Sequence, residues 1–390
     1  MTNPLALDLD TLLTPTALSV GLALLSFGVY LSSTLLSSPH PKPNMPLNTT
    51  EHTAPLELVN EGGQLNRLAA GWARGPIVTS ELLPSGAWWG YRSKQWEYWG
   101  VISPSLVLGL TLADLDYGTV IQLYLHDRAA NKSYRWEMPG IPPNRDLVHL
   151  PKTLPPFTCQ GQTGQFKVMF ADTEQAGKKI TTLAAKAPAS GTTPAVEMHL
   201  EVNTAGESFG VVVPWSDSRF QYTLKAPALP TTGTVKLGEK TYTVNNAWAT
   251  LDRGRGRWPY RMAWNWGVAL GQNSAGQRVG LTIGGRWTDG TGTTENALLL
   301  DGVVQGQGPL EDVAWIYDLK APEKPWKIRG SWIDAEITPW HVRVAGAQKI
   351  VMSSFTTQVF GQWKGSATVD GKTVSLDGLT GWAEDAANRW

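Results

Sequence analysis

Short strand-like segments follow one another along the chain from residue 56 to its end. Segments such as SLVLGLTLADL (105–115), TVIQLYLHD (119–127) and AVEMHLEV (195–202) alternate in polarity or are rich in β-branched residues, and Gly, Pro, Asn or Asp separates each from the next. No segment carries the long apolar stripe of helical period, with capping residues, that predicts an α-helix. The pattern therefore predicts an all-β fold, in sandwich or barrel form.

The Pro-rich stretch APALPTTG (226–233) is the clearest internal break in this β-region. A chain of 390 residues is long enough for two domains that each bury a core. We therefore expect two β-domains in tandem, a first over residues 56–230 and a second over residues 231–390.

The N-terminal region holds one long uncharged segment, ALSVGLALLSFGVYLSSTLL, at residues 17–36. As a helix rising about 1.5 Å per residue, it spans about 30 Å, the hydrocarbon thickness of a bilayer. No Lys or Arg precedes Lys42, whereas a secretory signal usually opens with basic residues. We expect a short tail (1–16), a single-pass transmembrane anchor (17–36) and a flexible Pro/Ser/Thr-rich spacer (37–55).

Two alternatives to the anchor stay open. The segment is a signal that is cleaved, which leaves the body secreted or lumenal, or translation starts at Met45 and leaves the segment out. With an anchor, the positive-inside rule favours a cytosolic body, although it rests on Lys42 alone. The sequence carries no signal for the oligomeric state.

Charge and metal-ligand content exclude several classes of function. Lys plus Arg (33) equals Asp plus Glu (33), so nucleic acid is not an expected partner. The single cysteine, Cys159, excludes an internal disulfide framework and a Cys-rich zinc site, and the six histidines show no HExxH spacing. Neither a P-loop nor a strand-linked GxGxxG is present. We expect no metal and no cofactor.

Tryptophan is unusually frequent, with 19 residues, and two stretches concentrate it. Trp is broad and apolar with one N–H, so it suits an apolar pocket, a platform for sugars or the core of a barrel. The stretches are AWWGYRSKQWEYWG (87–100) and LDRGRGRWPYRMAWNWGVALG (251–271). They supply the candidate acids Asp252 and Glu97, and together with the preceding strand the candidate ligand-binding residues Trp96, Tyr98, Trp248, Trp258, Trp264, Asn265 and Trp266.

The Arg-Gly alternation in the second stretch has two interpretations. In an extended strand the arginines at 253, 255 and 257 face one side, Gly254, Gly256 and Trp258 face the other, and Pro259 ends or bends the strand. The first interpretation is an internal sheet corner in which the arginines meet carboxylates, Asp252 among them. The second places Asp252 at the mouth of a Trp-lined cavity. An Asp252 in a salt bridge favours a structural role, and a buried, unpaired Asp252 favours a catalytic one.

Five motifs resemble a known family, the proteins with the domain of unknown function number 2804. These are GWARGP (71–76), WEYWG (96–100), LDYGTVIQLYLHD (115–127), DRGRGRWPYRMAWNWG (252–267) and GWAEDAANRW (381–390). The chain is more distantly similar to the double-lipocalin group, which includes carotenoid hydratases, AttH-like proteins and fungal decalin-forming cyclases. That resemblance implies two tandem lipocalin-like (calycin-type) β-barrels with an apolar cavity and chemistry without cofactors. It also implies that Asp252, Gly256, Trp264 and Trp266 correspond to the Asp, turn glycine and W-x-W strand of the hydratases.

Three functional hypotheses follow. The first is cofactor-independent binding or conversion of an apolar lipid or isoprenoid by hydration, isomerisation or cyclisation, with Asp252 as the acid and Trp faces stabilising a carbocation. The second is a carbohydrate-active β-protein that uses Glu97 and Asp252 as paired carboxylates. The third is a non-catalytic, membrane-anchored structural or interaction protein.

Overall fold

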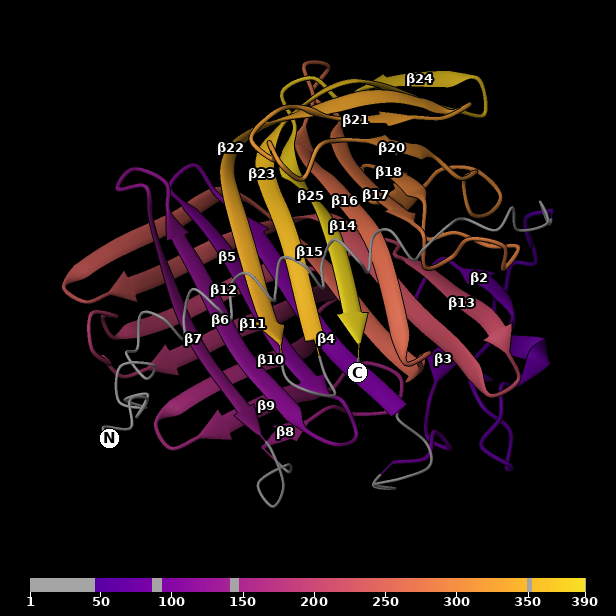
Figure 1. Ribbon diagram of the computed structural model, residues 1–390, viewed down its shortest axis with the longest axis horizontal. Coiled ribbons are helices and arrows are strands. Elements are labelled where there is room, and N and C mark those ends of the chain that lie inside the picture. The colour runs from indigo at the N-terminus through magenta and orange to yellow at the C-terminus, as the bar shows by residue number, and fades with distance from the viewer. Residues whose placement is uncertain (1–45, 86–92, 141–146, 349–352, 390) are drawn as a thin grey trace, which may run out of the picture.

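The structure, a computed structural model, describes residues 46–85, 93–140, 147–348 and 353–389. The described part consists of strands β1 to β25 and one 3-10 turn at Arg67–Ala69, without an α-helix. The predicted all-β fold is confirmed. The strands form two large antiparallel sheets, each of which curls into a half-barrel (Figure 1).

The first sheet contains the strands up to β15 and runs in the order β7-β6-β5-β4-β15-β14-β12-β11-β10-β9-β8, with β13 and β2 attached beside β14. A short parallel pair, β1 (Leu56–Glu57) and β3 (Val78–Thr79), stands apart from it. The bounds of the strands in the sheet are β2 (Gly71–Ala73), β4 (Ser93–Ile102), β5 (Leu106–Asp114), β6 (Thr119–Asp127), β7 (Lys132–Gly140), β8 (Val148–His149), β9 (Thr158–Thr163), β10 (Phe166–Gln175), β11 (Lys178–Ala187), β12 (Val196–Asn203), β13 (Phe209–Ser216), β14 (Arg219–Leu237) and β15 (Lys240–Arg257).

The second sheet contains the remaining strands in the order β19-β18-β17-β16-β25-β23-β22-β21-β20, with β24 beside β23. The bounds of its strands are β16 (Arg261–Gln272), β17 (Arg278–Gly285), β18 (Ala297–Leu300), β19 (Val303–Val304), β20 (Ala314–Ile316), β21 (Trp326–Arg329), β22 (Ile333–Gln348), β23 (Ser353–Val369), β24 (Lys372–Ser375) and β25 (Thr380–Arg389).

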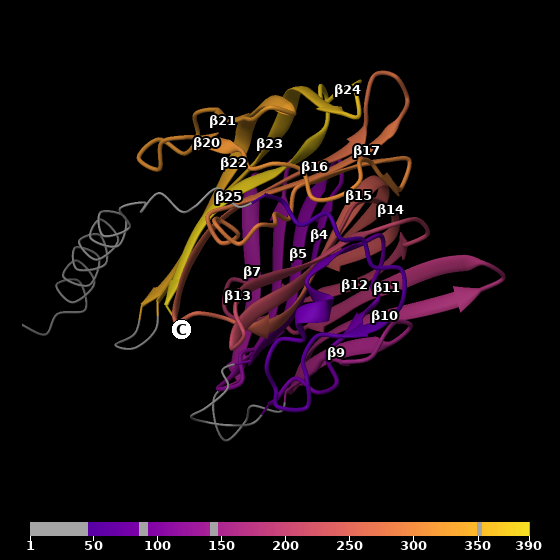
Figure 2. The ribbon, with the colours of Figure 1, turned by 90° about the vertical axis from the view of Figure 1, so that its right-hand side faces the viewer.

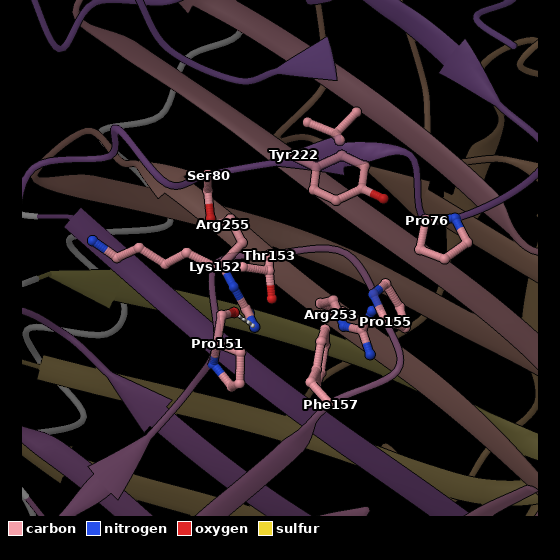
Figure 3. Close-up of a pocket in the computed structure, with 11 residues that line it drawn as sticks. Pro76, Ser80, Pro151, Lys152, Thr153, Pro155, Phe157, Tyr222, Arg253 and Arg255 are labelled. Carbon is pink, nitrogen blue, oxygen red and sulfur yellow. Dashed lines mark hydrogen bonds between the residues drawn. The ribbon is translucent and has the colours of Figure 1, made fainter. Parts of the chain in front are cut away.

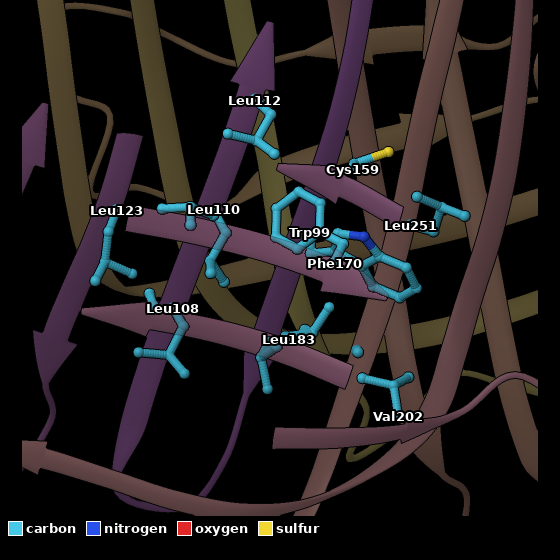
Figure 4. Close-up of a cluster of buried hydrophobic side chains, with 14 of the residues drawn as sticks. Trp99, Leu108, Leu110, Leu112, Leu123, Cys159, Phe170, Leu183, Val202 and Leu251 are labelled. Atoms are coloured by element: carbon cyan, nitrogen blue, oxygen red, sulfur yellow. The ribbon is translucent and has the colours of Figure 1, made fainter. Parts of the chain in front are cut away.

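Apolar side chains at alternate positions fill the concave side of each sheet. In the first sheet, β8 and β9 curl back to contact β5, and a cluster that includes Trp99, Leu110 and Phe170 is buried between the two walls (Figure 4). The end strands β7 and β8 do not pair with each other within the described residues, so the sheet remains open. A second cluster, around Trp326 and Trp363, fills the concave side of the second sheet.

A third apolar cluster joins the two sheets. It includes Trp266 and Trp382 from the second sheet and Ile102 and Tyr124 from the first, with Tyr98 packed against it. Figure 2 shows β16, β22 and β25 of the second sheet lying over β4 and β5 of the first. The sheets therefore meet through aromatic side chains, and the space between them is distinct from both concave cores.

The change from one sheet to the other does not occur at the Pro-rich stretch. The expected boundary at 230/231 lies inside β14, and the sheets change between β15, which ends at Arg257, and β16, which begins at Arg261. Pro227 lies where the pairing of β14 with β15 shifts register, between Ala226 and Leu229, and Pro230 lies between this shift and a second one at Thr231–Gly233. Proline is tolerated at such a bulge because the ladder is interrupted there. The predicted end of a strand at Pro259 is confirmed, whereas the division into two domains stays a prediction.

The predicted tail and anchor (1–16 and 17–36) lie outside the described residues. No helix in the described part is long and apolar enough to cross a membrane. The described end of the predicted spacer binds to the body: the Asn48 amide donates to the Gly292 carbonyl at 2.7 Å, and Arg74 pairs with Glu51 at 2.9 Å. The first sheet and its surroundings are thus contacted by residues that precede residue 56.

Gly254 lies where the Trp96 ring crosses β15. A Cβ at this position would come within 2.1 Å of the ring. Replacing Gly254 by alanine is therefore expected to lower the free energy of unfolding by about 1–3 kcal/mol, the usual cost of overpacking. Urea unfolding measures the effect. Gly75→Ala is the control, because a Cβ there meets nothing within 4 Å and the expected change is about 0.5 kcal/mol or less. Equal stabilities of the two variants would contradict the packing described here.

Candidate functional site

Glu97, one of the two candidate acids, lies inside the concave core of the first sheet. Arg253 is its direct neighbour across β4 and β15, and its Nε and Nη2 atoms each donate to the carboxylate at 2.8 Å. Glu97 is 1% exposed and Arg253 is 6% exposed. The arginines are thus internal, as expected, and Glu97 is the carboxylate that Arg253 meets. Glu97 thus serves as the buried counter-charge of Arg253.

Asp252 faces the other way, because adjacent residues of an extended strand point to opposite sides. The expected pairing of Asp252 with the arginines is therefore wrong. Its Oδ1 atom lies 2.9 Å from Lys225 Nζ on β14 and accepts a hydrogen bond from Thr223 Oγ1 at 3.2 Å. Lys225 Nζ also lies 3.0 Å from Glu295 Oε2. Asp252 is thus salt-bridged in the space between the two sheets, which by the criterion above favours a structural role.

One ammonium group and two carboxylates share this buried position. Burial by itself lowers the pKa of Lys225, but the charges of Asp252 and Glu295 outweigh it, so the pKa is raised. Burial raises the pKa of Glu295, and Lys225 counteracts the rise. Lys225 therefore keeps its proton, and its Nζ lies 4.3 Å from the centre of the Trp266 ring, a cation–π distance.

Glu384 on β25 lies in the same space and was not among the sequence candidates. Its carboxylate accepts hydrogen bonds from Trp264 Nε1 at 2.9 Å and from Gln358 Nε2 at 3.0 Å. Burial raises the pKa of Glu384 to about 7, and the nearby Asp252 charge adds to the rise. Glu384 therefore exchanges its proton near neutral pH.

The register of β25 with its neighbouring strands explains why Glu384 was not chosen as a candidate acid from the sequence. In the second sheet it lies opposite Trp266 of β16 and opposite Gln358 of β23. These three residues are far apart in the chain, so only strand pairing brings them together. The one signal in the sequence was the GWAED segment, in which an acidic pair follows a Trp after one intervening residue, Ala383.

The aromatic candidates largely converge on this space. Tyr98 makes edge-to-face contacts with Trp266 at 5.9 Å and with Trp382 at 6.2 Å between ring centres. Burial raises the pKa of Tyr98 further above its usual value, so its hydroxyl stays protonated. Trp248 packs against the same apolar cluster. We call the following residues the inter-sheet cluster: Tyr98, Lys225, Asp252, Trp264, Trp266, Glu295, Gln358 and Glu384.

Two further candidates form an aromatic group beside this cluster. Trp258 makes edge-to-face contacts with Trp96 at 5.6 Å and with Trp264 at 5.8 Å. Its Nε1 atom donates to Gln221 Oε1 at 2.6 Å. The indole rings therefore continue from the cluster along the contact between the sheets.

Asn265 does not join them. It follows Trp264 on β16 and so faces the concave core of the second sheet, where its Nδ2 atom donates to Tyr317 Oη at 3.0 Å and to the Glu384 carbonyl at 3.2 Å. Asn265 and Glu97 thus lie on the far faces of their strands from the inter-sheet cluster. Within the described residues, no three His, Cys, Asp or Glu side chains lie close enough to hold a metal ion.

The family model of the domain of unknown function DUF2804 matches residues 49–390. No curated protein matches the sequence significantly.

Three solved structures to which the chain is similar share little sequence with it. One is a putative AttH from Nitrosomonas europaea, with 12% identity, 78% of this chain and 94% of that chain covered, and a TM-score of 0.46. A second is kievitone hydratase from Nectria haematococca, with 11% identity, 83% and 98% covered, and a TM-score of 0.43. A third is CghA with Sch210972, with 10% identity, 76% and 88% covered, and a TM-score of 0.45.

Proposed function

The chain belongs to the DUF2804 family, and we propose that it binds an apolar lipid or isoprenoid molecule between its two sheets and converts it by proton transfer, without a cofactor. The observation that carries the proposal is Glu384, a buried carboxyl group with a pKa of about 7 among aromatic rings. A general acid works best when its pKa lies near the operating pH. Glu384 meets that condition.

The reaction class follows from this acid and its surroundings. Glu384 transfers its proton to one carbon of a C=C bond, and the π electrons form the new C–H bond. The other carbon is left as a cation, which the faces of Trp264 and Trp266 stabilise. Addition of water gives hydration, loss of a neighbouring proton gives isomerisation, and attack by a second C=C bond gives cyclisation. In each case the last proton returns to the Glu384 carboxylate.

In this proposal Asp252 contributes to the electrostatic surroundings of Glu384. Its ion pair with Lys225 holds β14 and β15 together, and its negative charge helps to raise the pKa of Glu384. Tyr98, Asp252 and Trp264 keep part of their surface accessible, so a ligand reaches Glu384 along these side chains. Glu97, on the opposite face of β4, supports the fold of the first sheet.

Replacing Glu384 by glutamine tests the assignment. Glutamine still accepts the hydrogen bond from Trp264 but has no acidic proton, so turnover is expected to fall about 10²–10⁴-fold while binding is retained. The probe is retinol, an uncharged isoprenoid polyene, added to the full chain. Quenching of Trp fluorescence measures binding. Loss of polyene absorbance, with the mass of the product, measures conversion.

Two controls make the outcome specific. Glu336→Gln on β22, whose partners Lys327 and Lys364 are exposed, is expected to leave both readouts unchanged. Mass spectrometry of molecules extracted from the purified full chain identifies a natural ligand directly. Turnover of retinol or of the extracted ligand by Glu384→Gln at the wild-type rate would show that Glu384 is not the acid. Binding without conversion by wild type would favour a non-catalytic binding protein. Absence of any apolar ligand would count against the proposal as a whole.

The same residue predicts a pH dependence of stability. The pKa of Glu384 is about 7 in the folded chain and 4.5 as its ordinary value. Between these two pH values Glu384 is protonated in the folded chain and ionised in the unfolded chain. The free energy of unfolding therefore falls as the pH rises, and above pH 7 it is roughly 3 kcal/mol lower than below pH 4.5. His341, whose pKa burial lowers to about 4, acts in the opposite direction over the same range. Urea unfolding is measured for wild type and Glu384→Gln from about pH 5 to about pH 8, and the difference between the two curves isolates the contribution of Glu384. Parallel curves would contradict the raised pKa.

A further inference from the structure

A small pocket lies at one end of the concave core of the first sheet, on the opposite face of β15 from the inter-sheet cluster (Figure 3). Residues 76–80 and 151–157 form its rim, and Tyr222, Arg253 and Arg255 lie at its base. It holds about 260 Å³ of empty space, including the part open to solvent, of which about 10 Å³ is available to the centre of a water molecule. That is room for about one water-sized group at the base.

The base of the pocket carries more positive than negative charge. Glu97 accepts both short hydrogen bonds from Arg253, and its nearest oxygen to Arg255 is 3.8 Å away. Arg255 instead donates to the carbonyl oxygens of Trp96, Gly254 and Pro151, at 2.7, 2.8 and 3.3 Å. Two buried guanidinium groups therefore share one carboxylate. A buried charge without its own counter-charge is costly, and a bound anion removes that cost.

Other charged groups lie near this base, but among the described residues Glu97 is the one carboxylate within 4.0 Å of Arg253 or Arg255. Burial raises the pKa of Asp172, which accepts a hydrogen bond from Thr181 Oγ1 at 2.7 Å. Lys152 lines the pocket and adds a positive charge, with its Nζ atom donating to the Leu83 carbonyl at 2.7 Å. Burial lowers the pKa of Lys152, and the charges of Asp114 and Asp116 raise it.

Tyr222 supplies an independent indication of a ligand. Its side chain is 2% exposed and lines the pocket, yet its hydroxyl group has no hydrogen-bond partner among the described residues. Burial raises the pKa of Tyr222, so the hydroxyl remains a donor. A buried donor without an acceptor is uncommon in native structures, and it indicates an acceptor that a ligand provides.

The walls of the pocket indicate the chemistry of the part of the ligand that lies outside its acceptor group. Their apolar part consists of three prolines, a valine and an aromatic ring (Pro76, Val78, Pro151, Pro155 and Phe157), and their polar part includes Ser80, Lys152 and Thr153. The alkyl part of an organic acid buries apolar surface against the apolar part, which an inorganic anion does not.

We propose that this pocket binds the carboxylate group of a small organic acid. Arg253 and Arg255 provide the positive charge, Tyr222 donates a hydrogen bond to a carboxylate oxygen, and the alkyl chain lies against the prolines towards the opening. The site is separate from Glu384, so it stands whether or not the proposed conversion takes place.

The test is calorimetric titration of the full chain with sodium hexanoate. Saturable binding of one molecule per chain is expected, and the uncharged analogue hexan-1-ol is expected not to bind over the same range. Tyr222→Phe removes only the unpartnered hydroxyl and should weaken hexanoate binding about tenfold, as for a lost hydrogen bond to a charged group. Tyr260→Phe is the matched control, because Tyr260 is 41% exposed, and it should bind as wild type does.

Three outcomes would overturn the proposal. These are no saturable binding of hexanoate to wild type, equal binding by wild type and Tyr222→Phe, and binding of inorganic phosphate as tight as that of hexanoate. The last outcome assigns the pocket to a free inorganic anion. Far-UV circular dichroism of Tyr222→Phe confirms that the variant is folded, so a loss of binding reports on the pocket.

Discussion

Replacing Lys225 by methionine is expected to lower the free energy of unfolding by about 3–5 kcal/mol at neutral pH. Lys225 is the shared counter-charge of Asp252 and Glu295, at 2.9 and 3.0 Å, and all three side chains are largely buried. Removing the ammonium group leaves two largely buried carboxylates without a counter-charge. Urea unfolding followed by Trp fluorescence measures the loss. It should shrink at low pH, because protonated carboxyl groups need no counter-charge.

The control lies on the same strand. Lys236 of β14 is exposed, so Lys236→Met should change the stability by about 0.5 kcal/mol or less. The triple variant Lys225→Met, Asp252→Asn, Glu295→Gln should recover much of the loss, since neutral groups in place of a buried ion network are tolerated better than a broken network. If Lys225→Met is as stable as Lys236→Met, the two salt bridges of Lys225 do not contribute to the stability of the fold.

Replacing Glu97 by glutamine is expected to cost a similar amount, about 3–5 kcal/mol. Glutamine keeps the size of the side chain but removes the carboxylate that Arg253 contacts among the described residues, and Arg255 lies beside it. Two guanidinium groups then remain in the core of the first sheet without a counter-charge. Chemical unfolding monitored by circular dichroism at neutral pH is the measurement.

Glu197→Gln is the matched control for this change. Glu197 also lies opposite a basic residue on the neighbouring strand, Lys186, but both side chains are more than half exposed. Exposed ion pairs contribute about 0–1 kcal/mol, so little change is expected. A Glu97→Gln variant that unfolds at the same urea concentration as Glu197→Gln would mean that burial adds nothing to the Glu97–Arg253 pair.

Strand β15 thus carries two different electrostatic sites on its two faces. Arg253 and Arg255 point into the first core, towards Glu97 and the pocket with Tyr222. Asp252 points into the space between the sheets, towards Lys225. Variants on one face should therefore leave the chemistry of the other face unchanged, which allows the proposed conversion and the proposed acid-binding pocket to be tested separately.

Local sequence patterns were enough to predict several features of this protein. Alternating polarity and frequent Gly and Pro predicted the all-β fold, because successive side chains of a strand point to opposite faces of the sheet, and the two faces have different surroundings. The same alternation predicted that Arg253, Arg255 and Arg257 share a face, and Pro259 marked the end of β15. Zero net charge and nearby Trp residues indicated that this segment is internal. Each of these properties depends on neighbours in the chain.

Only the tertiary structure decided which charged groups meet. Glu97 and Arg253 are paired by the register of β4 with β15, and Glu384 reaches Trp264 and Gln358 by the registers of β25 with β16 and β23. A shift of one residue in any of these registers turns the side chains to the other face, and no local pattern specifies the register between distant strands. For the same reason the sequence suggested Asp252 as a partner of the arginines, and the surroundings of Glu384 became visible only when its strand was placed beside β16.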